Sequence, residues 1–355
     1  MKWKPDWPEV RQHYIDWWNG DGLVVTLPAP REEAREGIEK PDEPEDLETA
    51  WLDPHYRLRR CLHQMATTHF GADAFPSFDA MIGPGSLGTF LGAEPVLEPT
   101  TVWYKPCIED PESYGTIEFD PKNNEWLDAH LALIDIGLEH ADGRYLVGMP
   151  DLIENIDVLA AMRGNETLLM DLIERPDWVQ QKVWEINRAF FDAFDLLYER
   201  IKDDRGGNVF HAFGLWGPGK TAKTQCDFSC MISEKMFADF VAPALEEQCE
   251  WLDYSMYHLD GTTAMQHLDA LLEIEPLDAI EWTPQSGLPG GGDPQWHELY
   301  RRIKDGGKSV QAVGVQPEEV VPLLDEAGPE GLHIRAHAES IEQAEALAET
   351  VDQYR

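Results

Sequence analysis

Apolar residues along the chain follow two alternating patterns. From about residue 140 onward, short runs rich in β-branched and aromatic residues alternate with longer segments whose apolar residues recur every three or four positions. The first pattern predicts strands and the second predicts amphipathic helices. The predicted strands cover residues 144–149, 208–213, 254–259, 278–282, 308–313 and 331–336. The predicted helices cover residues 176–201, 233–252, 293–306, 316–328 and 340–355.

This alternation predicts an α/β fold with a parallel sheet, because a helix between two strands returns the chain to the same edge of the sheet. Further strands are expected near residues 74–83 and 101–106, which brings the number of strand–helix units close to that of a (β/α)8 TIM barrel. The alternative is an open doubly wound sheet. That fold usually carries a glycine-rich phosphate turn, and the one candidate, residues 214–220, has the wrong glycine spacing.

The first 60 residues differ from the rest of the chain. They are rich in Pro, Trp and charged residues, and residues 31–48 have the composition of an exposed loop. We therefore expect residues 1–60 to form an N-terminal extension, an arm with helices that packs on a barrel formed by residues 61–355. Tryptophans exposed on this arm would suit a homodimer contact.

The charge balance restricts the partners. The 67 acidic and 28 basic residues give a formal net charge of −39, which repels nucleic acid and anionic membrane surfaces. A diffuse acidic excess also suits a salt-adapted, halophilic organism. No apolar run is long enough to span a membrane, the N-terminus lacks the pattern of a signal peptide, and the five cysteines do not suggest a disulfide framework. These features predict a cytoplasmic protein.

Polar and aromatic residues follow the predicted strands closely. In a (β/α)8 barrel the side chains at the C-terminal ends of the strands meet at one mouth, where the active site lies. The candidates at such positions are Asp79, Asp151, His211, Trp216, Asp227, Tyr257, His258, Asp260, Glu281, Trp282, Arg335 and His337. Acidic residues after a strand can also cap the next helix, so capping remains an alternative for Asp151 and Asp260.

These candidates divide by chemistry. A histidine among several carboxylates can share out acid and base roles, because crowded like charges raise one carboxyl pKa while another group stays ionised. We expect His258, Asp260, Asp79 and Glu281 to be catalytic, with His258 and Asp260 as the proton-handling pair. The predicted substrate-binding residues are Asp151, His211, Trp216, Asp227, Tyr257, Trp282 and His337.

The order of motifs resembles the uroporphyrinogen decarboxylase superfamily over roughly residues 62–350. The motifs are "FPSFDAMIGPGSLGTFLG", "YLVGMPDL", "DFSCMISEKMFADFVAPAL", "YHLDG", "LDAIEW" and "GLHIRAHAESIEQAEALAE". The resemblance implies a (β/α)8 barrel and includes zinc-dependent methyltransferases that move methyl groups between corrinoid proteins and thiols. Asp79 in "SFDAM" corresponds to the aspartate that binds pyrrole N–H groups in the decarboxylases, but their N-terminal arginine pair has no counterpart here.

The resemblance also bears on a metal. The methyltransferases hold zinc with a His-x-Cys pair and a later cysteine, whereas this sequence has His258, Leu259 and Asp260 at the pair and no cysteine near His337. A metal such as zinc, if bound, would use His258, Asp260 and His337 with harder ligands than thiolates. Otherwise the cofactor is unknown, and an acid–base pair remains.

The resemblance and the candidate residues together predict an enzyme that performs single-carbon chemistry, methyl transfer or decarboxylation, on a small organic substrate. A corrinoid protein or a thiol is the expected partner for methyl transfer. Paired carboxylates and tryptophans also allow a glycosidase-type hydrolase, which would place two carboxyl groups roughly 5–9.5 Å apart across the pocket. A ligand-binding member without catalysis is the third alternative.

Overall fold

The computed structural model describes residues 1–355, and its centre is a seven-stranded sheet. The strands of this sheet are β1 (Leu23–Pro30), β2 (Thr68–Ala72), β9 (Thr221–Gln225), β10 (Tyr254–Asp260), β11 (Ala279–Thr283), β12 (Ser309–Val315) and β13 (Leu332–Ala336). Their order is β2, β1, β13, β12, β11, β10, β9. All neighbours from β1 to β9 are parallel, and β2 is antiparallel at the edge.

Shorter strands lie outside this sheet. They are β3 (Ser77–Phe78), β4 (Glu94–Leu97), β5 (Val102–Lys105), β6 (Leu146–Val147), β7 (Asn208–Phe210) and β8 (Leu215–Gly217). The side chain of Asn208 bonds to the backbone N–H and C=O of Thr221 in β9, Gly148 bridges to β7, and β6 pairs in parallel with β3. This arrangement is consistent with a barrel-like α/β fold, and closure of the ring stays a prediction.

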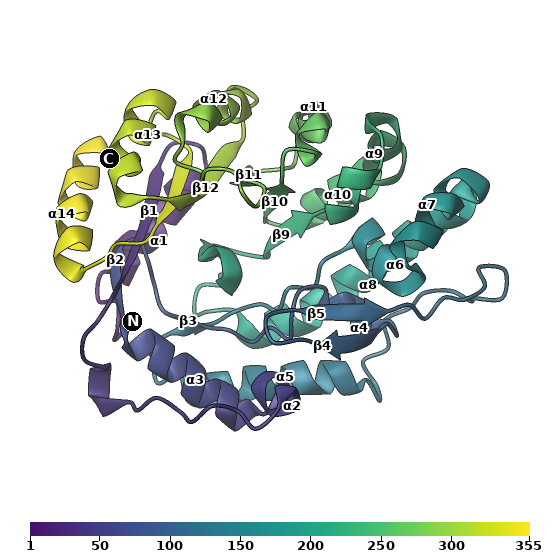
Figure 1. The fold of residues 1–355 in the computed structure, drawn as a ribbon, viewed down its shortest axis with the longest axis horizontal. Coiled ribbons are helices and arrows are strands. Elements are labelled where there is room, and N and C mark those ends of the chain that lie inside the picture. Colours follow the sequence, from purple (N-terminus) through teal and green to yellow (C-terminus); the bar gives the residue numbers. More distant parts are fainter.

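Helices pack around the strands, and α1 alone among the longer helices packs on the opposite face of the sheet from the others (Figure 1). They are α1 (Trp7–Trp18), α2 (Leu47–Leu52), α3 (Pro54–Ala66), α4 (Ser86–Phe90), α5 (Glu125–Glu139), α6 (Asn155–Arg163), α7 (Asn165–Glu174), α8 (Pro176–Ile201), α9 (Glu234–Phe240), α10 (Ala242–Trp251), α11 (Leu268–Glu273), α12 (His297–Asp305), α13 (Val320–Ala327) and α14 (Ile341–Val351). None of them combines the length and apolar character that a membrane crossing requires.

Two sequence expectations about these elements need correction. The helix expected over residues 233–252 is divided into α9 and α10 at Val241, because Pro243 cannot donate the backbone hydrogen bond of a continuous helix. The strand expected at residues 101–106 is β5, which forms an antiparallel hairpin with β4 and does not join the parallel sheet.

The two faces of the sheet have different environments. Side chains alternate along a strand, so Tyr257 and Leu259 of β10 pack in the large core between strands and helices, whereas Met256 points to the opposite face. On that opposite face Met256, together with Val24 of β1 and Ala279 of β11, packs against α1. We call it the inner face.

The N-terminal segment is part of the sheet rather than an arm added to it. β1 lies between β13 and β2, and α1 covers the inner face with buried Trp7, Trp17 and Trp18. Trp17 donates its indole N–H to the carbonyl of Gly331, 3.1 Å away, at the start of β13. A strand and a helix before residue 60 thus pack with the strands that follow, and these tryptophans are not exposed. The boundary expected at residue 60 stays a prediction.

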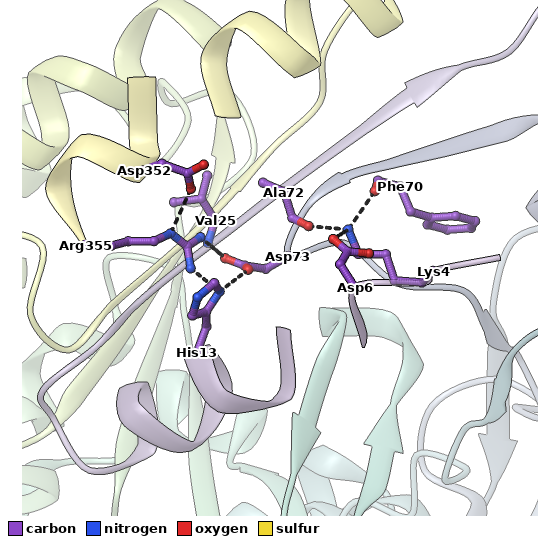
Figure 2. A network of polar contacts seen from close by, with 9 residues as sticks. All are labelled: Lys4, Asp6, His13, Val25, Phe70, Ala72, Asp73, Asp352 and Arg355. Carbon is purple, nitrogen blue, oxygen red and sulfur yellow. Dashed lines mark hydrogen bonds and ion pairs between the residues drawn. The ribbon is translucent and has the colours of Figure 1, made fainter. Parts of the chain in front are cut away.

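A polar network fastens both chain ends to this core (Figure 2). Asp73 accepts hydrogen bonds from the backbone N–H of Val25, from His13 Nδ1 and from Arg355, the last residue of the chain. His13 lies on α1, so one carboxylate ties together α1, β1 and the C-terminus. Asp73 is 1% exposed, and its negative charge is balanced within the network.

Candidate active site at the strand ends

The inner face becomes polar toward the C-terminal ends of the strands. In β10 the inner-face residues beyond Met256 are His258 and Asp260, and in β11 those beyond Ala279 are Glu281 and Thr283. The parallel register places His258 opposite Glu281 and Asp260 opposite Thr283. These side chains are neighbours because both strands deliver alternate residues to the same face at the same height.

His258 and Glu281 form a tightly bonded pair. Nδ1 of His258 contacts Oε2 of Glu281, and the second carboxylate oxygen accepts a hydrogen bond from Thr283 Oγ1 at 2.7 Å. The Glu281 side chain is fully buried and that of His258 is 14% exposed. Burial alone would disfavour the imidazolium, but the charge and hydrogen bond of Glu281 outweigh it and raise the pKa of His258.

Two further carboxylates approach the same histidine. One oxygen each from Asp227 and Asp260 and one ring nitrogen of His258 all lie within 4.8 Å of one another. Asp227 begins a short helical turn, Asp227–Met231, directly after β9. Burial raises the pKa of Asp260, and nearby Asp227 and Glu281 add to the effect, although His258 opposes it. The site can therefore hold a proton or a cation between acidic groups.

Two further acidic residues, Asp157 and Glu154, lie near Asp227. Asp157, on α6, accepts hydrogen bonds from the backbone N–H groups of Asp227 and Phe228 at 2.7 and 2.8 Å. Burial and the charge of Asp227 raise the pKa of Asp157 to about 6. Glu154 is fully buried, and desolvation holds its pKa well above the ordinary range. Sequence reasoning missed both residues, because nothing in the helix pattern around residues 154–157 distinguishes inward acids from solvent-facing ones.

Asp151 and Asp79 are each neutralised by a basic partner. Asp151 pairs with the buried ammonium of Lys223 at 2.8 Å, and Asp79 pairs with Arg57 at 3.1 Å. Arg57 also donates to the backbone carbonyl of Asp79 at 3.0 Å. Neither aspartate belongs to the group around His258, so their predicted catalytic and substrate-binding roles stay predictions.

His211 and His337 lie apart from the group around His258. Both line a cavity of about 610 Å³ that is bounded by β1, β2, α3 and the end of β13. Nδ1 of His211 is 2.8 Å from the hydroxyl of Ser77, and burial lowers the pKa of both histidines. The predicted metal set of His258, Asp260 and His337 is not the group that the structure brings together, since Asp227 takes the place expected for His337.

The three aromatic residues expected to contact substrate are core residues. Tyr257 and Trp282 lie on the helix-facing side of β10 and β11, 1% and 0% exposed, and Trp282 packs against Trp296. Trp216 is buried beside Trp7 of α1 and donates its N–H to Asp203 at 3.0 Å. All three rings are buried among core side chains, so their predicted contact with substrate stays a prediction.

Comparisons with known proteins give a match in structure only. No protein-family model and no curated protein matches the sequence. Among solved structures, a methyltransferase from Methanosarcina mazei superposes with a TM-score of 0.60 over 97% of this chain and 98% of its own. The two sequences are 11% identical, so the likeness concerns the fold. It extends over nearly the full length of both proteins, including the N-terminal segment.

Proposed function

We propose that this protein is a transferase that moves a methyl group to or from a small organic molecule at the C-terminal ends of β9, β10 and β11. A closed ring of strands would gather these ends at one mouth. The observation that carries the proposal is the His258–Glu281 pair with Asp227 and Asp260 around it. The superfamily that the sequence resembles includes both methyltransferases and decarboxylases. The likeness in fold to a methyltransferase favours methyl transfer.

The residues of this group suit activation of a methyl acceptor. A thiol or hydroxyl attacks a methyl group efficiently only after it loses its proton. Neutral His258 can accept that proton on the ring nitrogen that is not bonded to Glu281, and Glu281 then stabilises the imidazolium that forms. Glu281 also fixes the orientation of the ring, because its own second oxygen is held by Thr283.

The same group fits a divalent cation. A histidine that binds a metal through one ring nitrogen usually bonds a carboxylate or carbonyl through the other, as His258 bonds Glu281. Asp227, His258 and Asp260 would hold the cation, which when bound would lower the pKa of the acceptor. The acceptor would then lose its proton to solvent, and His258 would serve as a ligand and not as the base. The donor set has two carboxylates, one imidazole and no thiolate, and it can bind zinc, manganese or iron. It differs in this from the thiolate-rich type of zinc site.

The arrangement of carboxylates argues against the hydrolase alternative. A glycosidase needs two carboxyl groups that face each other across a sugar, roughly 5–9.5 Å apart. Here Asp227 and Asp260 stand together beside one histidine with oxygens within 4.8 Å, and the tryptophans expected to stack on a sugar are buried in the core. The third alternative is a protein that binds a ligand without catalysis. It differs from a transferase in that it shows no turnover.

The test is methyl transfer measured with a methylated corrinoid as donor and a panel of small thiols as acceptors. We expect demethylation of the corrinoid, seen in its visible spectrum, to depend on protein and thiol, and metal analysis to find about one divalent cation per chain at Asp227, His258 and Asp260. His258→Ala should abolish transfer. His55→Ala removes an exposed histidine on α3 and is the matched control. Absence of transfer in the unmodified protein with every thiol and every added cation would contradict the proposal.

A further inference from the structure

The 610 Å³ cavity beside the candidate active site has an unusual charge. Acidic residues make up 67 of the 355 residues in the chain, yet none of the 19 residues that line this cavity is acidic. The lining consists of apolar side chains, neutral polar ones such as Thr26, Gln64 and Ser77, two histidines, and Arg335. Arg335 is the one permanently charged residue among them.

Arg335 has no carboxylate partner. Its Nη1 donates to the backbone carbonyl of Ala212 at 2.7 Å, and no acidic oxygen lies within ion-pair distance of the guanidinium. Its Nε and Nη2 donate to no protein group and lie beside Gly214, another residue of the cavity wall. A guanidinium with one edge fixed and one edge free presents two parallel donors toward the cavity.

Two other arginines with largely buried side chains are paired with carboxylates. Arg57 meets Asp79 at 3.1 Å, and Arg163 meets Asp171 at 2.7 Å. The charge of Glu281 acts on Arg335 only from beyond ion-pair distance. A partly buried cation without a directly bonded carboxylate is costly, so it marks a place where an anion is expected from outside. Burial and the neighbouring Arg335 keep the pKa of His337 low, which leaves the arginine as the source of positive charge.

We propose that the cavity binds the carboxylate group of a small organic acid and that Arg335 holds this group with its free edge. The inference rests on the proposed function, because it names the class of methyl donor or acceptor that the transferase takes. The volume falls within the range of about 300–1,000 Å³ typical of small-molecule sites. The ligand would meet neutral hydrogen-bonding groups around its carboxylate and apolar walls along its body.

The cavity also lies next to the reacting group. The short turn His211–Phe213 separates the two regions: His211 and Ala212 line the cavity, while the ring of Phe213 lies 5.0 Å from that of His258. Arg335 lies on the inner face of β13, opposite Thr26 of β1, at the same end of the sheet as His258. An acid anchored at Arg335 would therefore extend past Phe213 toward His258.

The experiment measures binding by isothermal titration calorimetry and needs no turnover. The probes are benzoate and glutarate, each compared with its neutral amide, benzamide and glutaramide, at concentrations up to about 10 mM. We expect at least one carboxylate to bind at least about tenfold more tightly than its amide, because the charge-assisted, bidentate contact is lost in the amide. This comparison uses only the unmodified protein, so it does not depend on the folding of a variant.

Variants then locate the contact. Arg335→Gln should weaken carboxylate binding at least about tenfold, and Arg335→Lys should weaken it less, because the charge remains while the paired donors are lost. Arg188→Gln removes the same charge from an exposed position on α8 and should leave binding unchanged. Equal affinity for acids and amides, no detectable binding of either acid, or an unaltered affinity in Arg335→Gln would overturn the inference.

The outcome is separable from that of the proposed function. His258→Ala should bind the carboxylate probes within about twofold of the unmodified protein, since His258 does not line the cavity. Carboxylate binding without methyl transfer would contradict the transferase and leave the anion site in place. Methyl transfer without a preference for carboxylates over amides would support the transferase and contradict the anion site.

Discussion

Two histidine–carboxylate pairs occupy the inner side of this protein, and they differ in what surrounds them. Asp73 bonds His13, and Glu281 bonds His258, in both cases through Nδ1 of the ring. Asp73 also accepts from a backbone N–H and from Arg355, so its charge is balanced by a permanent cation. Glu281 has no arginine or lysine partner, and its histidine faces two further carboxylates instead.

This difference supports the proposal that the His258–Glu281 pair, and not the His13–Asp73 pair, acts in the reaction. The His13–Asp73–Arg355 network joins the first helix, the first strand and the last residue, and its bonds are already satisfied. The His258–Glu281 pair lies where the strands end, with an excess of negative charge that a proton or cation would relieve. The first pair should therefore control stability and the second should control activity.

The largest effect is expected for His258→Ala. Loss of a general base reduces turnover by about 10²–10⁴-fold, and loss of a metal ligand would do at least as much. The melting temperature should stay within about 3 °C, because His258 is not part of the hydrophobic core. Steady-state methyl transfer and thermal unfolding measure the two. Parallel loss of activity and stability would show that this pair is structural like the first.

The reverse pattern is expected for Asp73→Asn. The substitution leaves Arg355 without its buried counter-charge and weakens the bond to His13, at a cost of about 3 kcal/mol in the free energy of unfolding. Chemical denaturation measures this cost. Turnover under conditions where the variant is folded should match the unmodified protein. A matched control is Asp142→Asn, which breaks an exposed pair with Lys2 and should cost less than about 1 kcal/mol.

A smaller effect on activity is expected for Glu281→Gln. The amide keeps the shape of the side chain and can still accept a hydrogen bond from His258, but it no longer stabilises a positive charge on the ring. Turnover should fall by about 10–100-fold, as is usual when the carboxylate behind an active histidine is lost. Measurement of kcat separately from KM distinguishes this positioning role from substrate binding. Unchanged kcat would remove Glu281 from the mechanism.

The comparison also shows what the sequence could reveal. His258, Asp260 and Glu281 could be chosen as candidates because they end strands whose limits are visible as apolar runs. Asp227 is a candidate as a residue after the strand expected at 208–213, whereas it follows β9, which has no apolar run and is not expected from the sequence. The pairing of His258 with Glu281 requires the knowledge that β10 and β11 are adjacent and in register. The strand–helix–strand pattern is consistent with β10 and β11 as neighbours, but the sequence contains no signal for the register between them.

The aromatic residues and the first strand show where sequence reasoning fails. Tyr257 and Trp282 are one position away from inner-face residues, and a shift of one residue moves a side chain to the opposite face. β1 is not expected from the sequence, because residues 1–60 are interpreted from their content of Pro, Trp and charged residues. Pro28 and Pro30 also argue against a central strand. In the structure β1 pairs with β13 from Leu23 to Thr26, and the prolines follow in the part of β1 that pairs with β2. The first pair, His13 with Asp73, joins residues 60 apart in the chain without any local pattern.

The smallest expected effect concerns the pH dependence of stability. Burial would raise the pKa of Asp73, but His13 and Arg355 outweigh burial and hold it below the ordinary value of 3.8. A carboxyl whose pKa is lower when folded contributes stability above its unfolded pKa and loses it as the pH falls through the folded pKa. The free energy of unfolding should therefore decline below about pH 4 more steeply than in Asp73→Asn, by up to about 1.4 kcal/mol per pH unit. Urea denaturation of both proteins between about pH 3 and pH 6 measures the difference, and identical slopes would show that Asp73 is not held as an ion by this network.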